Sequence, residues 1–408
     1  MTAQIPQDPL EGTLLDGRYR VETQIATGGM STVYRGTDIR LDRPVAVKVM
    51  DSRYSGDQQF LARFQLEARA VARLSDPGLV AVYDQGHDGR HAFLVMELVE
   101  GGTLRELLRE RGPMPPHAVT AVLRPLLSGL AVAHRGGLVH RDVKPENVLI
   151  SDDGDVKLAD FGLVRAVAQA GITSTSVILG TAAYLSPEQV GSGNAGPRSD
   201  VYSLGILVYE MLTGATPFDG DTALAVAYQR MDHDVPAPSV GITGVPPQFD
   251  ELVLRATARD PAVRYADALD MGTELAAIAD ELQLPPFRVP APRNSAQHDS
   301  AVRHHSRVIE QPTERHPAGP PAGPPRNATR ALTRGPDDWH EPAAASEPAE
   351  YNAAAGQFAG IQLSDFDLAR QRARRMTLVW VLVVLILTSG VAAAAWTLGS
   401  NLTNLIGP

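Results

Sequence analysis

The sequence predicts an α+β protein with two lobes of unequal size, followed by a disordered linker and one transmembrane helix. Short β-branched runs dominate about 19–84, and only one helical segment interrupts them, which predicts a small β-rich lobe with one key helix. Helical periodicity dominates from 103 to about 284 and predicts a larger helical lobe. A shift in composition after residue 284 and an uncharged apolar run at 376–398 predict the other two parts.

Composition limits the classes of function. The chain has 408 residues and is 44% hydrophobic, which is enough for a buried core. Its formal net charge of -10 argues against nucleic acid as a partner, because nucleic-acid binders usually present a basic face. There is no cysteine, so disulfides, thiolate metal sites and cysteine nucleophiles are excluded.

Lysine is rare, and this makes each lysine a candidate functional residue. Of 37 basic residues only Lys48, Lys144 and Lys157 are lysines, and the others are arginines. Arginine does not replace a compact ammonium group on a thin stem beside phosphates. Two of the three lysines lie in the motifs described below.

The small lobe begins after an extension at 1–18, which lacks the pattern of a signal peptide. A turn of small residues then separates two strand-like runs. Glycine in such a turn lets backbone N–H groups approach the oxygens of a triphosphate, although an ordinary hairpin has the same appearance. The candidate nucleotide-binding residues of this turn are Ile25, Ala26, Thr27, Gly28, Gly29, Met30, Ser31, Thr32 and Val33.

A lysine and a glutamate of the small lobe form a candidate ion pair. Lys48 ends the alternating run Val45-Ala46-Val47 and is expected to face the nucleotide from a strand. Glu67 follows 19 positions later, in the middle of the predicted helix at 58–74. The alternative interpretations are a solvated strand-edge lysine and an ordinary surface salt bridge.

The strongest motif lies in the large lobe and predicts phosphoryl transfer. It reads His140-Arg141-Asp142-Val143-Lys144-Pro145-Glu146-Asn147, and Asp160-Phe161-Gly162 follows after a short strand pair. Asp142 is placed to accept the proton of an attacking hydroxyl, and Lys144 to stabilise the transferring phosphoryl group. Asn147 and Asp160 offer the hard oxygen ligands that Mg²⁺ prefers.

The remaining chain predicts a linker and a membrane anchor. Residues 285–375 are rich in Pro, Ala, Arg, His and Ser, and a segment of this composition is expected to stay disordered. The run at 376–398, at about 1.5 Å per residue, is long enough for a hydrocarbon core of about 30 Å; a buried core helix is the alternative. Four arginines precede this run, so the lobes are expected to be cytoplasmic and 399–408 a short extracytoplasmic tail: Arg370, Arg372, Arg374 and Arg375.

Over 19–284 these motifs resemble the eukaryotic-type protein kinase family, and most closely the bacterial serine/threonine kinases of the actinobacterial Pkn group. The resemblance implies a bilobal protein-kinase-like fold with an N-lobe at about 19–99 and a C-lobe at about 100–284. It implies ATP as cofactor together with Mg²⁺, or alternatively Mn²⁺. Lys48 would contact the α- and β-phosphates and pair with Glu67, Asp142 would be the catalytic base, and Asn147 and Asp160 would hold the metal.

The same resemblance assigns the adenine site and the apolar stack that aligns the lobes. Met96 would be the gatekeeper, and Glu97 to Val99 the hinge that hydrogen-bonds adenine. Val33, Ala46 and Leu149 would sandwich the adenine ring. The members of the apolar stack would be Val71, Val82, His140 and Phe161.

Substrate class and regulation follow from the resemblance too. Lys144, Thr181 and the segment Tyr184–Glu188 resemble serine/threonine rather than tyrosine kinases, with Glu188 expected to pair with Arg264 and Asp200 to brace the catalytic loop. Thr173 and Thr175 lie where related kinases autophosphorylate, and the partner in this reaction would be a second copy of the chain. Other implied partners are proteins bearing Ser or Thr, and membrane lipid.

The resemblance implies a single-pass protein of the cell (inner) membrane that signals to cell-envelope growth, division or transcription. The sequence departs from the family pattern at Ala26 and Ser31, which replace two glycines of the nucleotide-binding turn. Three other interpretations remain: a pseudokinase scaffold, a small-molecule phosphotransferase, and a linker that recruits partners through Pro317–Pro325. The pseudokinase interpretation is disfavoured because Lys48, Asp142 and Asp160 are all present.

Overall fold

The computed structural model describes residues 10–29, 31–54, 57–89, 91–161, 182–220 and 222–310, and two short strands further along the chain. These strands, β10 (Gln357–Phe358) and β11 (Ile361–Gln362), pair with each other. The predicted transmembrane segment at 376–398 lies outside the described residues, as does the rest of the predicted linker beyond 310.

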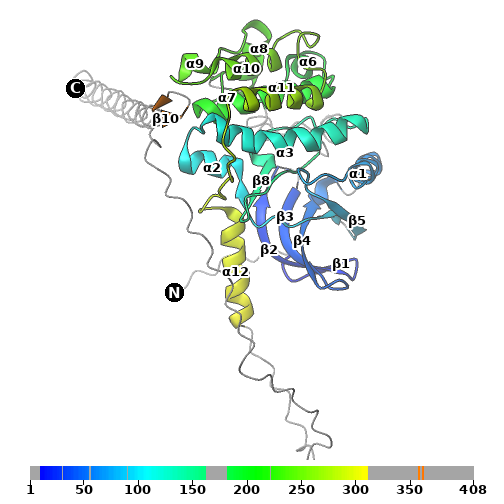
Figure 1. The fold of residues 1–408 in the computed structure, drawn as a ribbon. Helices are drawn as coiled ribbons and strands as arrows, with labels where there is room; N and C mark the ends of the chain where they lie inside the picture. The colour runs from blue at the N-terminus through cyan, green and yellow to red at the C-terminus, as the bar shows by residue number, and fades with distance from the viewer. Residues whose placement is uncertain are drawn as a thin grey trace, which may run out of the picture.

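The small lobe is an antiparallel sheet with one helix packed on it (Figure 1). The sheet order is β1-β2-β3-β4-β6-β5, and exposed and buried residues alternate along β2, as expected for a strand with one solvated face. Helix α1 (Gln58–Val71) is capped by the side chain of Asp57 and packs Phe60, Phe64 and Ala68 inward. The strands are β1 (Leu14–Leu15), β2 (Tyr19–Thr27), β3 (Ser31–Asp38), β4 (Arg43–Met50), β5 (Val82–Asp88) and β6 (His91–Met96), with a 3₁₀ turn at Ser52–Tyr54.

The large lobe is helical, apart from one small sheet below the hinge. Strands β7 (Gly101–Thr103), β8 (Val148–Ser151) and β9 (Val156–Leu158) form this sheet, and a 3₁₀ turn at Pro145–Asn147 leads into β8. The helices described here are α2 (Leu104–Arg111), α3 (Pro116–Arg135), α6 (Pro187–Gly191), α7 (Pro197–Thr213), α8 (Ala223–Asp232), α9 (Pro238–Gly241), α10 (Pro247–Ala256), α11 (Ala268–Glu281) and α12 (Ala296–Glu310).

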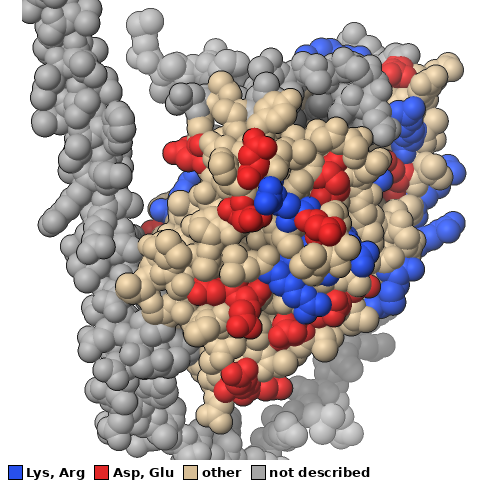
Figure 2. All heavy atoms as spheres, turned by 90° about the horizontal axis from the view of Figure 1, so that it is seen from above, with Lys and Arg blue, Asp and Glu red and all other residues tan. Residues whose placement is uncertain are grey.

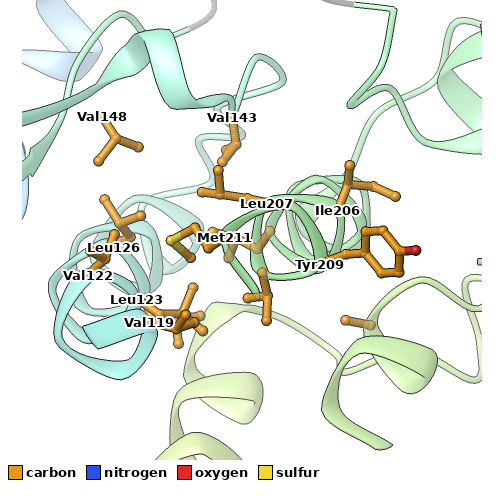
Figure 3. Packing of buried hydrophobic residues seen from close by; sticks show 14 of the residues in the cluster. Val119, Val122, Leu123, Leu126, Val143, Val148, Ile206, Leu207, Tyr209 and Met211 are labelled. Atoms are coloured by element: carbon orange, nitrogen blue, oxygen red, sulfur yellow. The ribbon is translucent and has the colours of Figure 1, made fainter. Parts of the chain in front are cut away.

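Helices α3 and α7 form the centre of the large-lobe core. Figure 3 shows Val119, Val122, Leu123 and Leu126 of α3 beside Leu207 and Met211 of α7. The catalytic loop rests on the same core through Val143, which is fully buried. The loop therefore stands on a rigid base, which is what a site that must hold its geometry requires.

Charged residues of both signs are interspersed on the face of the molecule seen from above the large lobe (Figure 2). Among the described helices, one is apolar and long enough to cross a membrane, namely α3, and two thirds of it is buried in the large lobe. Its burial identifies it as a core helix of this lobe.

The folded part extends beyond the predicted start of the linker at 285. Val289 and Ser295 are buried against the large lobe, and α12 follows and lies along β2 (Figure 1). The prediction of a disordered linker from residue 285 is thus wrong for 285–310. Val289 is a buried apolar contact of this stretch, but many of its other contacts use polar side chains and backbone groups, which leave no apolar stripe in the sequence.

Candidate active site

The catalytic loop brings Asp142, Lys144 and Asn147 together. The Nζ of Lys144 lies 3.0 and 2.8 Å from the two carboxylate oxygens of Asp142. The amide nitrogen of Asn147 donates to the backbone carbonyl of Asp142 at 2.8 Å and to its Oδ2 at 3.0 Å. Both partners hold the Asp142 side chain in one orientation, so a hydroxyl group that approaches it meets a fixed acceptor.

Asp200 braces this loop from helix α7, as predicted. Its carboxylate accepts hydrogen bonds from the backbone N–H groups of His140 at 2.8 Å and Arg141 at 2.7 Å, and it contacts His134 Nε2 at 2.8 Å. Asp200 is completely buried. The backbone of Arg141 has φ 71, a left-handed conformation that non-glycine residues rarely adopt, and the bonds to Asp200 hold it there.

Lys48 forms an ion pair with Asp160. Its Nζ lies 2.7 Å from Asp160 Oδ1, and only 4% of Lys48 is exposed. Burial alone would raise the pKa of Asp160, but the charge and hydrogen bond of Lys48 outweigh it and hold the pKa below its ordinary value. Asp160 is therefore a carboxylate at neutral pH, the form that binds a divalent cation.

Glu67 does not pair with Lys48, so the predicted Lys48–Glu67 contact is absent among the described residues. One carboxylate oxygen of Glu67 is buried without a hydrogen-bond partner, and burial raises the pKa of this side chain. Glu67 instead lines a cavity of about 100 Å³ together with Arg141 and Phe161. Lys48 has one ammonium group, and Asp160 already neutralises its charge. Glu67 on α1 therefore lies at this cavity and not beside Lys48.

The predicted adenine-site residues from both lobes lie in one apolar cluster. Ala46, Met96 and Val99 are buried in it, and Val33 and Leu149 pack against it. Strand pairing explains the arrangement, because Ala46 of β4 is directly opposite Met96 of β6. The turn at 25–33 is a hairpin between β2 and β3 in which the Gly28 N–H donates to the Ser31 carbonyl at 2.8 Å; Met30 lies outside the described residues.

The third lysine, Lys157, holds the hinge. Its Nζ lies 2.9 Å from Glu97 Oε1 and 3.1 Å from Oε2, and the backbone N–H of Glu97 donates to the Ala81 carbonyl. These contacts fix both the side chain and the backbone N–H of Glu97, the first residue of the predicted hinge. The sequence assigned no role to Lys157, although the scarcity of lysine was a signal that pointed to it.

The predicted apolar stack is assembled across the lobes. The rings of His140 and Phe161 are 4.6 Å apart between centroids, and Phe161 lines one pocket with Val71 and Val82. His140 is fixed in turn, because its Nε2 lies 2.9 Å from the Ala159 carbonyl. This column connects α1 and β5 of the small lobe to the catalytic loop.

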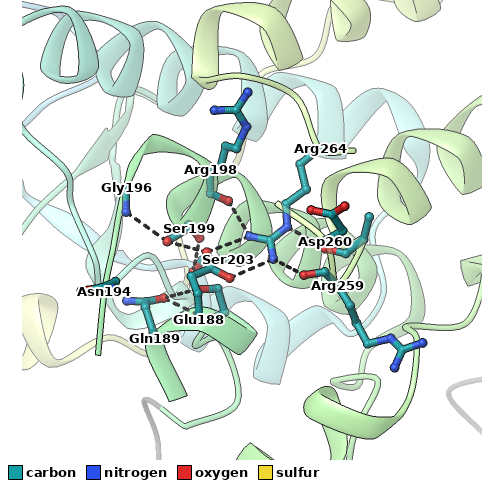
Figure 4. Close-up of polar contacts among 12 residues, drawn as sticks. Glu188, Gln189, Asn194, Gly196, Arg198, Ser199, Ser203, Arg259, Asp260 and Arg264 are labelled. Carbon is teal, nitrogen blue, oxygen red and sulfur yellow. Dashed lines mark hydrogen bonds and ion pairs between the residues drawn. The ribbon is translucent and has the colours of Figure 1, made fainter. Parts of the chain in front are cut away.

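Glu188 and Arg264 form the predicted ion pair beside the segment Tyr184–Glu188, which is predicted to dock the substrate (Figure 4). Two guanidinium nitrogens of Arg264 each lie 2.9 Å from a carboxylate oxygen of Glu188, and Ser199 donates to the same carboxylate at 2.6 Å. Burial acts to raise the pKa of Glu188, but these hydrogen bonds lower it overall. The pair anchors the start of α6 to the loop before α11.

A second buried network holds the docking segment from above. The guanidinium of Arg105 in α2 binds Glu146 at 2.8 Å and also binds the Tyr184 hydroxyl and Glu210. Burial, reinforced by Glu210, raises the pKa of Tyr184, so its hydroxyl stays protonated and donates to Glu210. Arg105 thus connects the catalytic loop, through Glu146, with the segment at 184–188. No local sequence pattern marks this network, because its members are far apart in the chain.

The donor set fits a divalent cation that is shared with phosphate oxygens. The amide nitrogen of Asn147 is bound to Asp142, so its carbonyl oxygen is the atom left for a metal, and Asp160 supplies a carboxylate. Within the described residues no cluster of three or more His, Cys, Asp or Glu residues forms a complete metal site. Mg²⁺ commonly binds in this way, through one or two protein oxygens together with nucleotide phosphates.

Five predicted site residues lie outside the described residues. These are Met30 of the nucleotide-binding turn, Thr173 and Thr175, the candidate phosphorylation sites, and Gly162 and Thr181 near the two ends of one stretch. Their roles stay predictions.

Comparisons with known proteins agree with this geometry. The family model for the protein kinase domain matches residues 19–266. The chain is 71% identical over 405 residues to serine/threonine-protein kinase PknL of Mycobacterium tuberculosis (strain ATCC 25618 / H37Rv), covering 98% of each chain. It is 42% identical over 294 residues to serine/threonine-protein kinase PknA of M. tuberculosis (strain ATCC 25177 / H37Ra), covering 71% of this chain and 68% of that one.

A solved structure shares the fold. The crystal structure of the M. tuberculosis PknI kinase domain aligns with a TM-score of 0.52 and 25% identity, covering 66% of this chain and 99% of that one. The expected resemblance to bacterial Pkn-type kinases is thereby confirmed.

Proposed function

Because this chain belongs to the protein kinase family, and within it is a serine/threonine protein kinase, we propose that it works as a membrane-anchored enzyme activated by autophosphorylation. In this proposal it transfers the γ-phosphate of Mg-ATP to Ser and Thr hydroxyls of proteins. The single observation that carries it is the catalytic loop, in which Lys144 and Asn147 hold the carboxylate of Asp142.

Each residue of the loop has a distinct task in this reaction. Asp142 accepts the proton of the substrate hydroxyl, and Lys144, 2.8 Å away, supplies positive charge where charge develops on the transferring group. Asn147 and Asp160 would hold the metal, which supplies charge neutralisation between the β- and γ-phosphates when it is bound. Lys48 is placed to bind the nucleotide phosphates from β4.

Activation by phosphorylation is supported by the present pairing of Lys48. Protein kinases need the strand lysine paired with the helix glutamate, whereas here Lys48 binds Asp160 and Glu67 is left in a cavity. A phosphate on Thr173 or Thr175 would add about -1.5 to -2 charge close in sequence to the catalytic loop, and Arg141 is the cation expected to meet it. We propose that this event brings Glu67 to Lys48, and that a second copy of the chain delivers the phosphate.

Membrane anchoring is supported by the apolar run at 376–398 and the four arginines before it. Similarity to the M. tuberculosis PknL covers 98% of both chains, so the relative shares nearly the whole C-terminal region. We propose a single-pass location in the cell membrane with the kinase domain in the cytoplasm, where it acts on envelope growth, division or transcription.

Transfer from Mg-ATP by the full chain in detergent micelles tests the proposal, with the isosteric Asp142→Asn variant beside it. The catalytic base contributes about 10²–10⁴-fold, so the variant should lose at least that factor. Mass spectrometry of the wild-type chain should find phosphate on Thr173 or Thr175. Equal transfer by both chains would contradict the role of Asp142, and a wild-type chain whose phosphates lie elsewhere would contradict the activation step.

The exchange of ion pairs is tested separately with Glu67→Gln. If Glu67 pairs with Lys48 only after phosphorylation, this substitution should reduce the activity of the phosphorylated chain and leave nucleotide binding by the unphosphorylated chain unchanged. A substitution without effect on the phosphorylated chain would contradict the exchange.

A further inference from the structure

A segment beyond the large lobe crosses the hinge and binds both lobes. It comprises residues 286–304 and is called the strap here. The strap leaves the end of α11, passes the turn between β8 and β9, and continues as α12, which lies along β2 of the small lobe (Figure 1).

The first half of the strap is fixed to the large lobe. Val289 is buried with 2% exposed, and the Ser295 hydroxyl, also buried, donates to the carbonyl of Gly101 in β7. The backbone N–H groups of Arg293 and Ala296 donate to the carboxylates of Glu110 at 2.7 Å and Glu106 at 3.0 Å.

The fit at the hinge is close. At Gly102 a side-chain Cβ would lie 2.4 Å from Pro292 and 2.7 Å from Ser295, so only glycine allows this approach. His298 adds a contact of 2.9 Å between its Nε2 and a carboxylate oxygen of Asp152, which lies directly after β8.

The second half of the strap is fixed to the small lobe. Arg303 Nη2 donates to the carbonyl of Gln24 at 3.0 Å, and His304 Nδ1 lies 3.4 Å from a carboxylate oxygen of Glu22. Ser300 faces inward and is 1% exposed, whereas Val302 on the outer face is 65% exposed. One helix therefore binds large-lobe atoms at its start and β2 atoms about two turns later.

The small-lobe contact points lie next to the nucleotide site. Gln24 immediately precedes Ile25, the first residue of the nucleotide-binding turn, and both belong to β2. Any opening of the lobes moves β2 relative to Gly101, and the strap is bound to both. The ion pair between Arg35 and Glu100, at 2.8 Å, spans the same hinge and acts in the same sense.

We propose that the strap is a positioning element for the nucleotide: it holds β2 over the site and thereby sets nucleotide affinity. The strap touches none of the catalytic-loop residues by any hydrogen bond or ion pair found in the described part of the chain. Its release should consequently weaken nucleotide binding while the affinity for a peptide substrate stays the same.

The experiment compares two variants of α12 in the full chain, in detergent micelles. Ser300→Glu places a carboxylate at a buried position of α12, the helix that lies along β2, and should push the helix away. Val302→Glu adds the same group to the same helix, but on its exposed face. For each chain we would measure the Kd of Mg-ADP, the KM values for ATP and for a Ser/Thr peptide, and hydrogen exchange of the amides in β2.

The proposal expects Ser300→Glu to raise the Kd of Mg-ADP and the KM for ATP by about five- to tenfold, as the loss of one to two hydrogen bonds would. The KM for peptide should stay within about twofold, exchange in β2 should rise, and Val302→Glu should match the wild type. Faster hydrogen exchange in β2 with an unchanged Kd of Mg-ADP would overturn the proposal, because β2 would then be released from the strap without any loss of nucleotide affinity. Unchanged exchange would overturn it equally, because the strap would not hold β2.

A second variant covers the case in which Ser300→Glu does not fold. The double substitution Ser295→Ala/Arg303→Ala removes one polar anchor on each lobe and adds no volume. We expect the same increase in the Kd of Mg-ADP without a change in the KM for peptide. A wild-type Kd together with faster hydrogen exchange in β2 would contradict the proposed role of the strap.

Discussion

The three lysines of the chain each form an ion pair with a carboxylate of the catalytic region. Lys48 pairs with Asp160, Lys144 with Asp142, and Lys157 with Glu97. An ammonium group is compact and its donors rotate freely. The same group can therefore bind a carboxylate in this structure and a phosphate oxygen once a nucleotide is bound. Arginine instead takes the positions that need a rigid fork, such as Arg264 against both oxygens of Glu188.

The pair of Glu188 and Arg264 makes the stability of the large lobe depend on pH. Arg264 is almost completely buried, and hydrogen bonds lower the pKa of Glu188 below its ordinary value of 4.5 in spite of the opposing effect of burial. A carboxyl group whose pKa is lower in the folded chain contributes stability above the unfolded pKa and loses it as the pH falls through the folded pKa. This contribution is therefore complete at neutral pH and declines below about 4.5.

Glu188→Gln tests this contribution by its melting temperature at several pH values. Leaving Arg264 buried without its partner should cost about 3 kcal/mol at pH 7, a decrease in Tm of about 6–12 °C for a domain of this size. The difference from the wild type should shrink as the pH falls below about 4.5. Glu251→Gln, on the exposed side of α10, is the matched control and should change little. A Tm difference that is the same at pH 7 and pH 4 would refute the assignment.

Among the helices in the described part of the chain, α7 has the largest share of buried residues, and a glycine allows this. Nearly every residue of α7 is buried, and Gly205 faces the C-terminal end of α10. A Cβ at Gly205 would lie 2.5 Å from Thr257 Cγ2 and 2.9 Å from Ala256 Cβ. Because α7 also carries Asp200, any displacement of this helix reaches the catalytic loop.

Gly205→Ala should therefore destabilise the large lobe, although alanine normally favours a helix. Overpacking of a closed core costs about 1–3 kcal/mol, which outweighs the helix propensity gained, about 1 kcal/mol. Gly196→Ala, at the N-cap position just before the same helix, meets open space and should have a smaller effect. The melting temperatures of both variants and the wild type, measured by fluorescence during thermal unfolding, test this difference. A Gly205→Ala chain as stable as the wild type would contradict the prediction and show that α10 moves aside easily.

The elements with strong apolar periodicity could be predicted from the sequence. The predicted helix at 58–74 is α1 at Gln58–Val71, and the helical pattern of Ala118–His134 lies within α3. Helix α12 was missed, because the buried residue in its described part at 296–304 is a serine, Ser300, and its contacts use backbone carbonyls and carboxylates of distant segments. The orientation of Glu67 was missed for another reason: a sequence places Glu67 on α1 but does not fix how α1 sits against β4.

For the whole molecule, the short motifs predicted the catalytic residues, whereas the polar contacts between residues far apart in the chain became visible only in the structure. Asp142, Lys144 and Asn147 are neighbours in sequence, so a short pattern specifies their geometry. The tie between Arg105 and Tyr184, and the strap on β2, join residues far apart in the chain. Each depends on a few polar atoms that no local pattern marks.

The predicted anchor at 376–398 would place this kinase at the membrane, and this prediction is tested by changing the hydropathy of the run alone. Val383→Arg together with Val384→Arg places two charges near the centre of the run, each costing about 2.5–3.5 kcal/mol for membrane insertion. The wild-type chain should stay in the membrane fraction after an alkaline wash, and the double variant should become soluble. Ala353→Arg/Ala354→Arg adds the same charges outside the run and should stay in the membrane fraction, since insertion depends on the apolar stretch. A double variant at 383 and 384 that remained in the membrane fraction would refute a transmembrane helix, and a wild-type chain that washed off would refute membrane anchoring as a whole.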